Sequence, residues 1–178
     1  MEFYNQSNQL KKFIKKGEKK KEDLAELIAI SSGKGGVGKS NFILNLAIAL
    51  SIRGKKVLLI DADMNLSNID ILLGIYPEFT LSNFLDDLIS VEKVLVDGPK
   101  GIKILPAASG DINVMNNGEK LQKSLIKVYN DLRKDFDFIL IDTGAGISDI
   151  TVDFIVSANQ TILITTPEPT SITDVYAM

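Results

Sequence analysis

The alternation of short, continuously apolar segments with helical stretches constrains the fold of this chain more than any other feature. Five apolar segments predict strands, at Leu27–Ile30, Val57–Ile60, Ile102–Leu105, Phe138–Ile141 and Thr161–Thr165. Helices are predicted at 39–53, 80–95, 119–134 and 147–157, and a last helix is expected to begin at Thr170 or Ser171. Strands that are apolar throughout need cover on both faces. The chain is therefore predicted to fold as an α/β domain, a mostly parallel sheet with helices on both faces.

The amino-acid composition excludes several kinds of catalytic and metal-binding site. The 178 residues include no Cys, no His and no Trp. The chain alone therefore cannot form a Ser-His-Asp triad, a Cys/His zinc site, a Cys-ligated iron–sulfur cluster or a disulfide. Acid–base or metal chemistry must come from Asp, Glu, Lys, Tyr, Ser or Thr. No apolar run reaches the roughly 18 residues of a membrane span, and no secretory signal is present, so a cytoplasmic location is expected.

The charge is divided unevenly along the chain. Residues 1–22 contain seven Lys and three Glu, a net charge of +4, whereas the remainder has a net charge of −7. Within the first segment, Leu10, Phe13 and Ile14 recur at helical spacing among lysines. We therefore predict a basic N-terminal arm at 1–22, a short amphipathic helix plus a linker, followed by an acidic α/β domain at 23–178. The acidic domain argues against a nucleic-acid partner.

A glycine-rich turn follows the first predicted strand. Gly33–Ser40 satisfies the phosphate-loop pattern, a glycine, four residues and then Gly-Lys-Ser, between a strand and a helix. Backbone N–H groups of such a turn surround phosphates, while Lys39 is expected to reach the β- and γ-phosphates and Ser40 to coordinate Mg²⁺. The alternative is a glycine-rich turn that binds nothing. The candidate nucleotide-binding residues are Gly33, Lys34, Gly35, Gly36, Val37, Gly38, Lys39, Ser40 and Asn41.

Acidic residues follow two of the predicted strands. Asp61 and Asp63 come after the second strand, and Asp142 ends the fourth. Ligands of open α/β sheets bind at the carboxyl ends of the strands. Carboxylates that face a triphosphate act through Mg²⁺ or water. Asp142 fits the Walker B role, in which the carboxylate holds Mg²⁺ through a water molecule.

A second lysine in the turn carries a family resemblance. Lys34 begins the run Lys-Gly-Gly-Val-Gly-Lys-Ser, which resembles the deviant Walker A motif of the MinD/ParA family of dimerising P-loop ATPases. The resemblance implies ATP and Mg²⁺ as cofactors and a two-fold, ATP-dependent homodimer. In that dimer Lys34 would reach the partner's nucleotide, so Lys34 and Lys39 join the catalytic candidates. The spacing by itself indicates only that Lys34 is a cation close to the phosphates. The alternative is that Lys34 is a solvated lysine of the loop.

The same resemblance assigns roles to the acidic segments. Residues 61–70 are similar to switch I of the MinD branch, which implies that Asp63 orients the attacking water and Asp61 lies around the metal, with Ser40 and Asp142. Asp70 could instead be a helix cap or a surface acid. Residues 142–147 would form switch II, or else a plain strand-to-helix turn. Residues 165–170 either line the nucleotide region or simply end a strand.

The arm favours one branch of the family. Asn5-Gln6-Ser7 with Leu10-Lys11 resembles, in relaxed form, the Asp-Gln-Ala…Leu-Arg motif of the FlhG group, regulators of flagellar number. The resemblance implies that Gln6, Leu10 and Lys11 bind the GTPase FlhF; a solubilising tail is the alternative. A division-site (MinD) or partitioning (ParA) ATPase, or a nucleotide-dependent interaction module with negligible hydrolysis, are the rival functions. Without cysteine, the cluster-carrying branches are excluded for this chain.

The C-terminus predicts an incomplete domain. A helix is expected to begin near Ser171, yet the sequence stops at Met178 after about two turns. Members of the resembled family dock on membranes through an amphipathic C-terminal helix. Membrane binding is therefore expected only through a segment beyond Met178, and the choice of adenine over guanine depends on the resemblance.

Overall fold

The computed structural model describes residues 24–63, 69–80, 83–84, 89–106 and 118–178. In this part of the chain one sheet has the strand order β3-β4-β2-β5-β1-β6. Neighbouring strands are parallel except β3 and β4, which are antiparallel. The bounds are β1 Glu26–Ser32, β2 Val57–Ala62, β3 Val96–Asp97, β4 Lys103–Leu105, β5 Phe138–Thr143 and β6 Gln160–Ile164. The five predicted strands and the mostly parallel sheet are confirmed.

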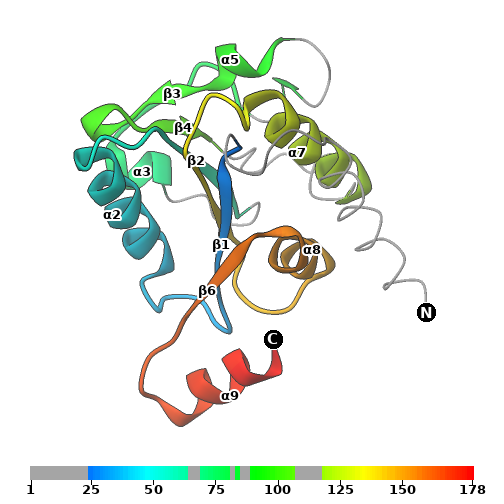
Figure 1. Ribbon diagram of the computed structural model, residues 1–178. Coiled ribbons are helices and arrows are strands. Elements are labelled where there is room, and N and C mark those ends of the chain that lie inside the picture. The colour runs from blue at the N-terminus through cyan, green and yellow to red at the C-terminus, as the bar shows by residue number, and fades with distance from the viewer. Residues whose placement is uncertain (1–23, 64–68, 81–82, 85–88, 107–117) are drawn as a thin grey trace.

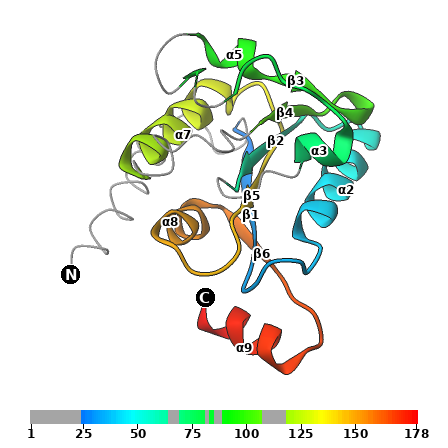
Figure 2. The same ribbon diagram turned by 180° about the vertical axis from the view of Figure 1, so that it is seen from behind.

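Helices cover both faces of the sheet, as predicted. Figures 1 and 2 show α7 and α8 on one face and α2 and α3 on the other, while α9 lies below the edge where β1 and β6 end. The bounds are α2 Lys39–Ile52, α3 Ile69–Leu73, α5 Val91–Val94, the 3₁₀ turn η1 Pro99–Gly101, α7 Gly118–Leu132, α8 Asp149–Ser157 and α9 Pro169–Ala177. None of the helices described is long and apolar enough to cross a membrane.

Alternating strand residues divide between two cores. In β1, Leu27 and Ala29 belong to the cluster under α7 and α8, whereas Ile28 and Ile30 belong to the cluster under α2. All four are less than 8% exposed. Because successive side chains of a strand point to opposite faces, a strand buried on both faces must be apolar throughout. This is the pattern from which the sheet was predicted.

The helix predicted over 80–95 is wrong. Among the described residues of this stretch, Asn83 and Phe84 are helical, the chain bends at Ile89, and a separate short helix, α5, begins at Val91. Ser90 between them is extended, with φ −76° and ψ 154°. The break turns the chain so that Val91 and Val94, 2% and 0% exposed, pack into the α7 side of the core. Tertiary packing therefore overrides the helical period here.

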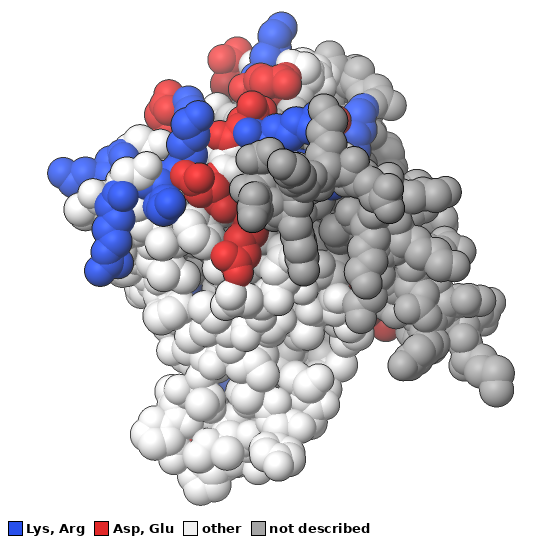
Figure 3. Space-filling view, viewed as in Figure 1, with Lys and Arg blue, Asp and Glu red and all other residues white. Residues whose placement is uncertain are grey.

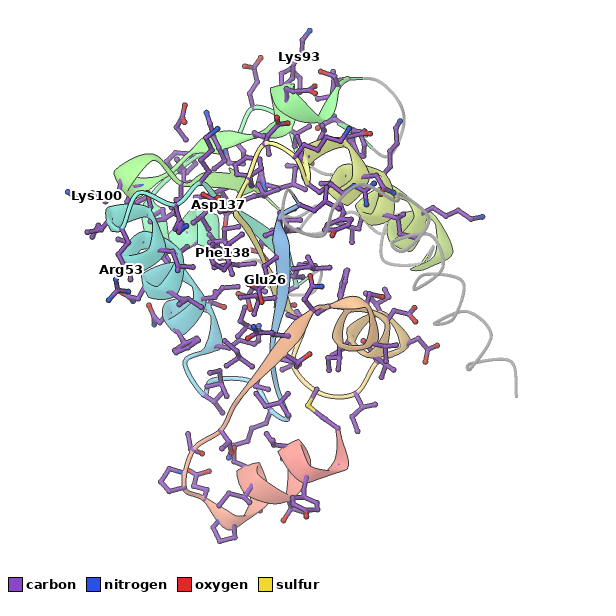
Figure 4. All side chains as sticks on the ribbon, viewed as in Figure 1. Glu26, Arg53, Lys93, Lys100, Asp137 and Phe138 are labelled. Carbon is purple, nitrogen blue, oxygen red and sulfur yellow. The ribbon has the colours of Figure 1, made fainter. Side chains whose placement is uncertain are left out.

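Charged side chains gather at the edge of the sheet where the strands begin. In Figure 3 the lower part of this face, over α9, shows few charged atoms, whereas Lys, Arg, Asp and Glu crowd the upper left. Figure 4 labels Glu26 and Asp137 near the starts of β1 and β5, and Arg53 and Lys100 near the end of α2. The opposite edge, where the parallel strands end, is where a ligand of such a sheet is expected.

Candidate functional site

The turn between β1 and α2 has a conformation that requires glycine. Gly36 and Gly38 have φ values of 78° and 92°, a region that residues with a Cβ rarely adopt. Gly38 occupies the N-cap position of α2, and no side chain caps that end of the helix. The N–H groups of the first turn of α2 therefore remain available to an anion at the positive end of the helix dipole.

A pocket of about 450 Å³ opens beside this turn. This volume lies in the range of small-molecule sites. The pocket brings together Gly35, Gly36, Gly38, Lys39, Ser40 and Asn41 of the predicted nucleotide-binding set, with Asp63, and it is completed by Ser32, Ile71, Leu72 and Ala145. The other three members of the set, Gly33, Lys34 and Val37, lie outside its lining.

Lys39 and Asp142 form a buried ion pair next to the pocket. The Lys39 ammonium donates a hydrogen bond to the Asp142 carboxylate, and the two residues are 7% and 1% exposed. Burial raises the pKa of the Asp142 carboxyl above its ordinary value, and the Lys39 charge and a hydrogen bond from Ser40 oppose that shift. Lys39, which is expected to contact the phosphates, and Asp142, which is expected to hold Mg²⁺, thus neutralise each other's charge.

Asp61 and Asp63 have different positions relative to the pocket. Asp61 is 1% exposed and lies beside Asp142 in the β2–β5 register. One oxygen of Asp61 accepts a hydrogen bond from the Asp63 N–H at 3.1 Å. This contact fixes the chain where Asp63 enters the pocket. Asp61 itself does not line the pocket. Its carboxylate instead bonds the backbone at the start of the predicted switch I.

The remaining part of the predicted switch I is only partly described. Residues 64–68 lie outside the described residues. Asp70 accepts a hydrogen bond from the Ile71 N–H at 2.8 Å, near the start of α3. Asp70 is therefore a partly exposed acid within the first turn of α3, where a negative charge suits the helix dipole, and it is not the N-cap of that helix.

The donor set suits Mg²⁺ bound together with phosphates. No group of three or more His, Cys, Asp or Glu within the described ranges could hold a metal ion by itself. Ser40, Asp61 and Asp142 offer one hydroxyl and two carboxylates at the same edge of the sheet. Mg²⁺ is commonly held by one or two carboxylates, waters and substrate phosphates. These residues therefore fit Mg²⁺ in a nucleotide complex.

Lys34 is held by an acidic residue of the same chain. Its ammonium donates to Glu168, which occupies the N-cap position of α9. The side chains are 34% and 63% exposed, and ion pairs this exposed contribute about 0–1 kcal/mol. Lys34 can therefore exchange this partner easily. The sequence leaves two interpretations of 165–170 and does not predict a role for Glu168, whose position between Pro167 and Pro169 is its only distinguishing feature there.

Helix α9 packs directly on the phosphate loop. A Cβ added to Gly33 would lie 2.5 Å from the Asp174 Cβ and 2.8 Å from the Val175 nitrogen. The fully buried Ser171 hydroxyl accepts from the Thr166 N–H at 3.3 Å, which secures the turn before α9. Close packing therefore explains the first glycine of the motif, a reason that the sequence did not reveal. The helix starts at Pro169, one residue before Thr170 and two before Ser171, the two predicted starts.

The predicted switch II also contacts the loop. Gly146 has a φ of 80°, and its N–H donates to the Ser32 carbonyl oxygen at 2.9 Å. Ala145 lines the pocket. The turn after β5 is thus placed to respond to what the pocket holds. The predicted partner-binding residues Gln6, Leu10 and Lys11 lie outside the described residues.

Comparison with known proteins identifies the family. The ParA family, described as the NUBPL iron-transfer P-loop NTPase, matches residues 23–177. The chain belongs to the ParA/MinD family of P-loop NTPases. The predicted family is thereby confirmed. The 178 residues contain no cysteine.

Two curated relatives match most of this chain, and the name of one of them refers to the flagellum. The antiactivator FleN of Pseudomonas aeruginosa is 42% identical over 153 residues, which are 86% of this chain and 55% of that protein. The flagellum site-determining protein YlxH of Helicobacter pylori is 34% identical and covers 85% of this chain and 52% of its own length. The chain spans about half the length of these relatives.

Two solved structures share the fold. The cell division ATPase MinD of Pyrococcus furiosus superposes with a TM-score of 0.75 at 33% identity, covering 86% of this chain and 65% of that one. The septum site-determining protein MinD of Pyrococcus horikoshii, solved with Mg-ADP, gives a TM-score of 0.73 at 32% identity, with 85% and 62% covered. These likenesses confirm the P-loop NTPase fold.

Proposed function

We propose that this chain is the nucleotide-binding part of a cytoplasmic, dimerising Mg-ATP hydrolase that regulates the number or placement of flagella. The observation that carries the chemistry is the buried Lys39–Asp142 pair beside a pocket lined by the phosphate loop and Asp63. The flagellar output is supported by the similarity to FleN and YlxH. A division-site role is the alternative, supported by the similarity to MinD of Synechocystis, which is 39% identical over 152 residues.

Nucleotide binding would rearrange charges that are already in the site. Lys39 would leave Asp142 for the phosphates, since the loop N–H groups and the start of α2 attract the same anion. Asp142 and Ser40 would then be free to hold Mg²⁺, with Asp61 beside them. When bound, Mg²⁺ would neutralise part of the negative charge of the phosphates. Asp63 would orient the attacking water, because Asp63 belongs to the pocket lining.

Dimerisation would use the partly exposed Lys34. Its bond to Glu168 is weak, so a second nucleotide site facing this surface can compete for the ammonium. The partner's phosphates, which carry several negative charges, are a stronger attractor than a single solvated carboxylate. ATP binding would therefore favour the dimer, and hydrolysis would return the protein to monomers, which is a population shift that other proteins can detect.

The test of this function is ATP-dependent dimerisation of a Lys34→Ala variant. We expect wild-type protein with Mg-ATP to shift towards dimer in light scattering, and Lys34→Ala to remain monomeric while binding ATP within about threefold of wild type. Lys100→Ala, an exposed lysine far from the pocket, is the matched control and should dimerise normally. Dimerisation of Lys34→Ala at the wild-type ATP concentration would contradict the proposal.

Removal of the N-terminal arm tests the proposed flagellar function. We propose that residues 1–22, through Gln6, Leu10 and Lys11, bind the GTPase FlhF. Removal of 1–22 is expected to abolish co-purification with FlhF and the stimulation of its GTP hydrolysis, while ATP binding by the domain is unchanged. Gln6→Ala should retain binding and lose stimulation. Unchanged FlhF binding after removal of the arm would favour the division-site or partitioning alternative.

A further inference from the structure

Asp61 is a buried carboxylate near the carboxyl end of β2 that does not line the nucleotide pocket. It is 1% exposed and lies beside Asp142 in the β2–β5 register. A carboxylate without access to water is costly unless hydrogen bonds compensate for the lost hydration. The groups that Asp61 binds therefore indicate what this side chain does.

The two oxygens of Asp61 bind two different backbone N–H groups. Oδ1 accepts a hydrogen bond from the Asp63 N–H at 3.1 Å, and Oδ2 accepts one from the Ile69 N–H at 3.5 Å. The first contact has the spacing of an Asx turn, in which an aspartate side chain fixes the backbone two residues further on. Ile69 is the first residue of α3, so its N–H has no acceptor within that helix. One side chain therefore holds the main chain at two positions.

Both of these positions lead to walls of the nucleotide pocket. Asp63 lines the pocket itself, and so do Ile71 and Leu72, the third and fourth residues of α3. Ile69 is 1% exposed and packs into the core under α2, next to which α3 lies in Figure 2. The start of α3 is thus fixed by a buried side chain and by the bond to Asp61. Asp61 therefore helps to set two parts of the pocket wall at once.

The Asp63 carboxylate acts on the centre of the site. Burial is the main cause that raises the pKa of the Asp142 carboxyl, and the negative charge of Asp63 raises it further. The two carboxylates are therefore close enough to interact. A shift of about 1 Å in a reacting group can lower a rate about 100-fold, so the backbone that carries Asp63 needs a fixed position.

Asp61 and Asp142 differ in what their oxygens contact. One oxygen of Asp142 accepts from the Lys39 ammonium, a side chain that bound phosphates would attract away. The oxygens of Asp61 accept from backbone N–H groups, which phosphates cannot attract without moving the main chain. Nucleotide binding would therefore release Asp142 for Mg²⁺ and leave the contacts of Asp61 in place.

We propose that Asp61 is a positioning residue for ATP hydrolysis, which acts through the backbone of Asp63 and Ile69 and not as a ligand of Mg²⁺. This role depends on the proposed function, in which Asp63 orients the attacking water. Two N–H donors need two acceptor oxygens, and asparagine offers one oxygen and an NH₂ group that cannot accept. Glutamate would place its oxygens one methylene further from the strand. The geometry therefore requires aspartate at position 61.

Asp61→Asn tests the role in the full chain. We expect kcat for ATP hydrolysis to fall about 10- to 100-fold, while KM for ATP and the Mg²⁺ concentration at half-maximal activity stay within about twofold of wild type. Loss of a metal ligand would instead raise the required Mg²⁺ concentration severalfold. Loss of a residue with only a structural role would change KM together with kcat. Either of these results would overturn the proposal.

Asp137→Asn is the matched control for Asp61→Asn. Asp137 makes the same type of bond at the opposite edge of the sheet, where its Oδ2 accepts from the Lys56 N–H at 2.8 Å (Figure 4 labels Asp137). Its replacement removes a carboxylate that holds backbone far from the nucleotide pocket. We therefore expect kcat of Asp137→Asn to stay within about twofold of wild type.

Amide hydrogen exchange, followed residue by residue by NMR without nucleotide, tests the contacts themselves. We expect the Asp63 and Ile69 amides of the wild type to be protected, and Asp61→Asn to speed the exchange of at least one of them about tenfold. The Lys56 amide should respond only to Asp137→Asn. An Asp63 amide that exchanges in the wild type as fast as an unstructured one would overturn the proposal, even if Asp61→Asn did not fold.

Hydrolysis by the wild type separates this role of Asp61 from the proposed function. Wild-type protein that binds Mg-ATP without hydrolysing it would overturn the proposed hydrolysis and the role of Asp61 together. A hydrolysing wild type with an equally active Asp61→Asn variant would overturn the role of Asp61 alone.

Discussion

Replacing Lys39 by methionine is expected to lower the free energy of unfolding by about 3 kcal/mol at neutral pH. Methionine keeps the volume but removes the charge that neutralises Asp142, a residue only 1% exposed. Removing one partner of a buried pair leaves the other charge without compensation, and protonation of Asp142 limits the cost because burial already raises its pKa. Urea unfolding followed by circular dichroism measures the difference.

The double variant Lys39→Met with Asp142→Asn is the control for this prediction. With both charges gone, most of the lost stability should return, because replacement of a buried pair by neutral groups of similar volume is often nearly neutral. Nucleotide binding should not return, since Lys39 is expected to contact the phosphates. A double variant as unstable as Lys39→Met would show that the cost comes from packing around position 39.

The sheet and its connection to the phosphate loop were predictable because each step is local. A strand buried on both faces must be apolar throughout, and a loop that surrounds phosphate needs glycine where φ is positive, as at Gly36 and Gly38. Each requirement concerns a few consecutive residues. Short elements such as β3, with two residues, leave no pattern that periodicity can detect.

The pairings within the site were not predictable because they depend on the order of the strands. Lys39 and Asp142 are 103 residues apart, and they meet because β5 lies beside β1, with Asp142 opposite Ile30 in the register. Lys34 and Glu168 are 134 residues apart and meet because α9 folds back over the loop. A motif names the residues that bind a ligand, but it does not name their partners within the chain.

Replacing Asp63 by asparagine is expected to reduce ATP hydrolysis about 10²- to 10³-fold with little change in ATP affinity, as for loss of a group that acts on the proton of the attacking water. Asparagine keeps the size of the side chain, and the Asp63 N–H that bonds Asp61 at 3.1 Å belongs to the backbone, so the local structure is retained. Single-turnover phosphate release measures hydrolysis, and a fluorescent ATP analogue measures binding.

Asp70→Asn is the matched control for Asp63→Asn. Asp70 is seven positions along the same segment, outside the pocket lining, and its contact is with the Ile71 N–H at the start of α3. An asparagine oxygen can accept the same hydrogen bond, so hydrolysis should stay within about twofold of wild type. Equal hydrolysis by wild type and Asp63→Asn would remove Asp63 from the mechanism. Negligible hydrolysis by wild type, with Mg-ATP-dependent dimers intact, would instead favour a nucleotide-dependent interaction module.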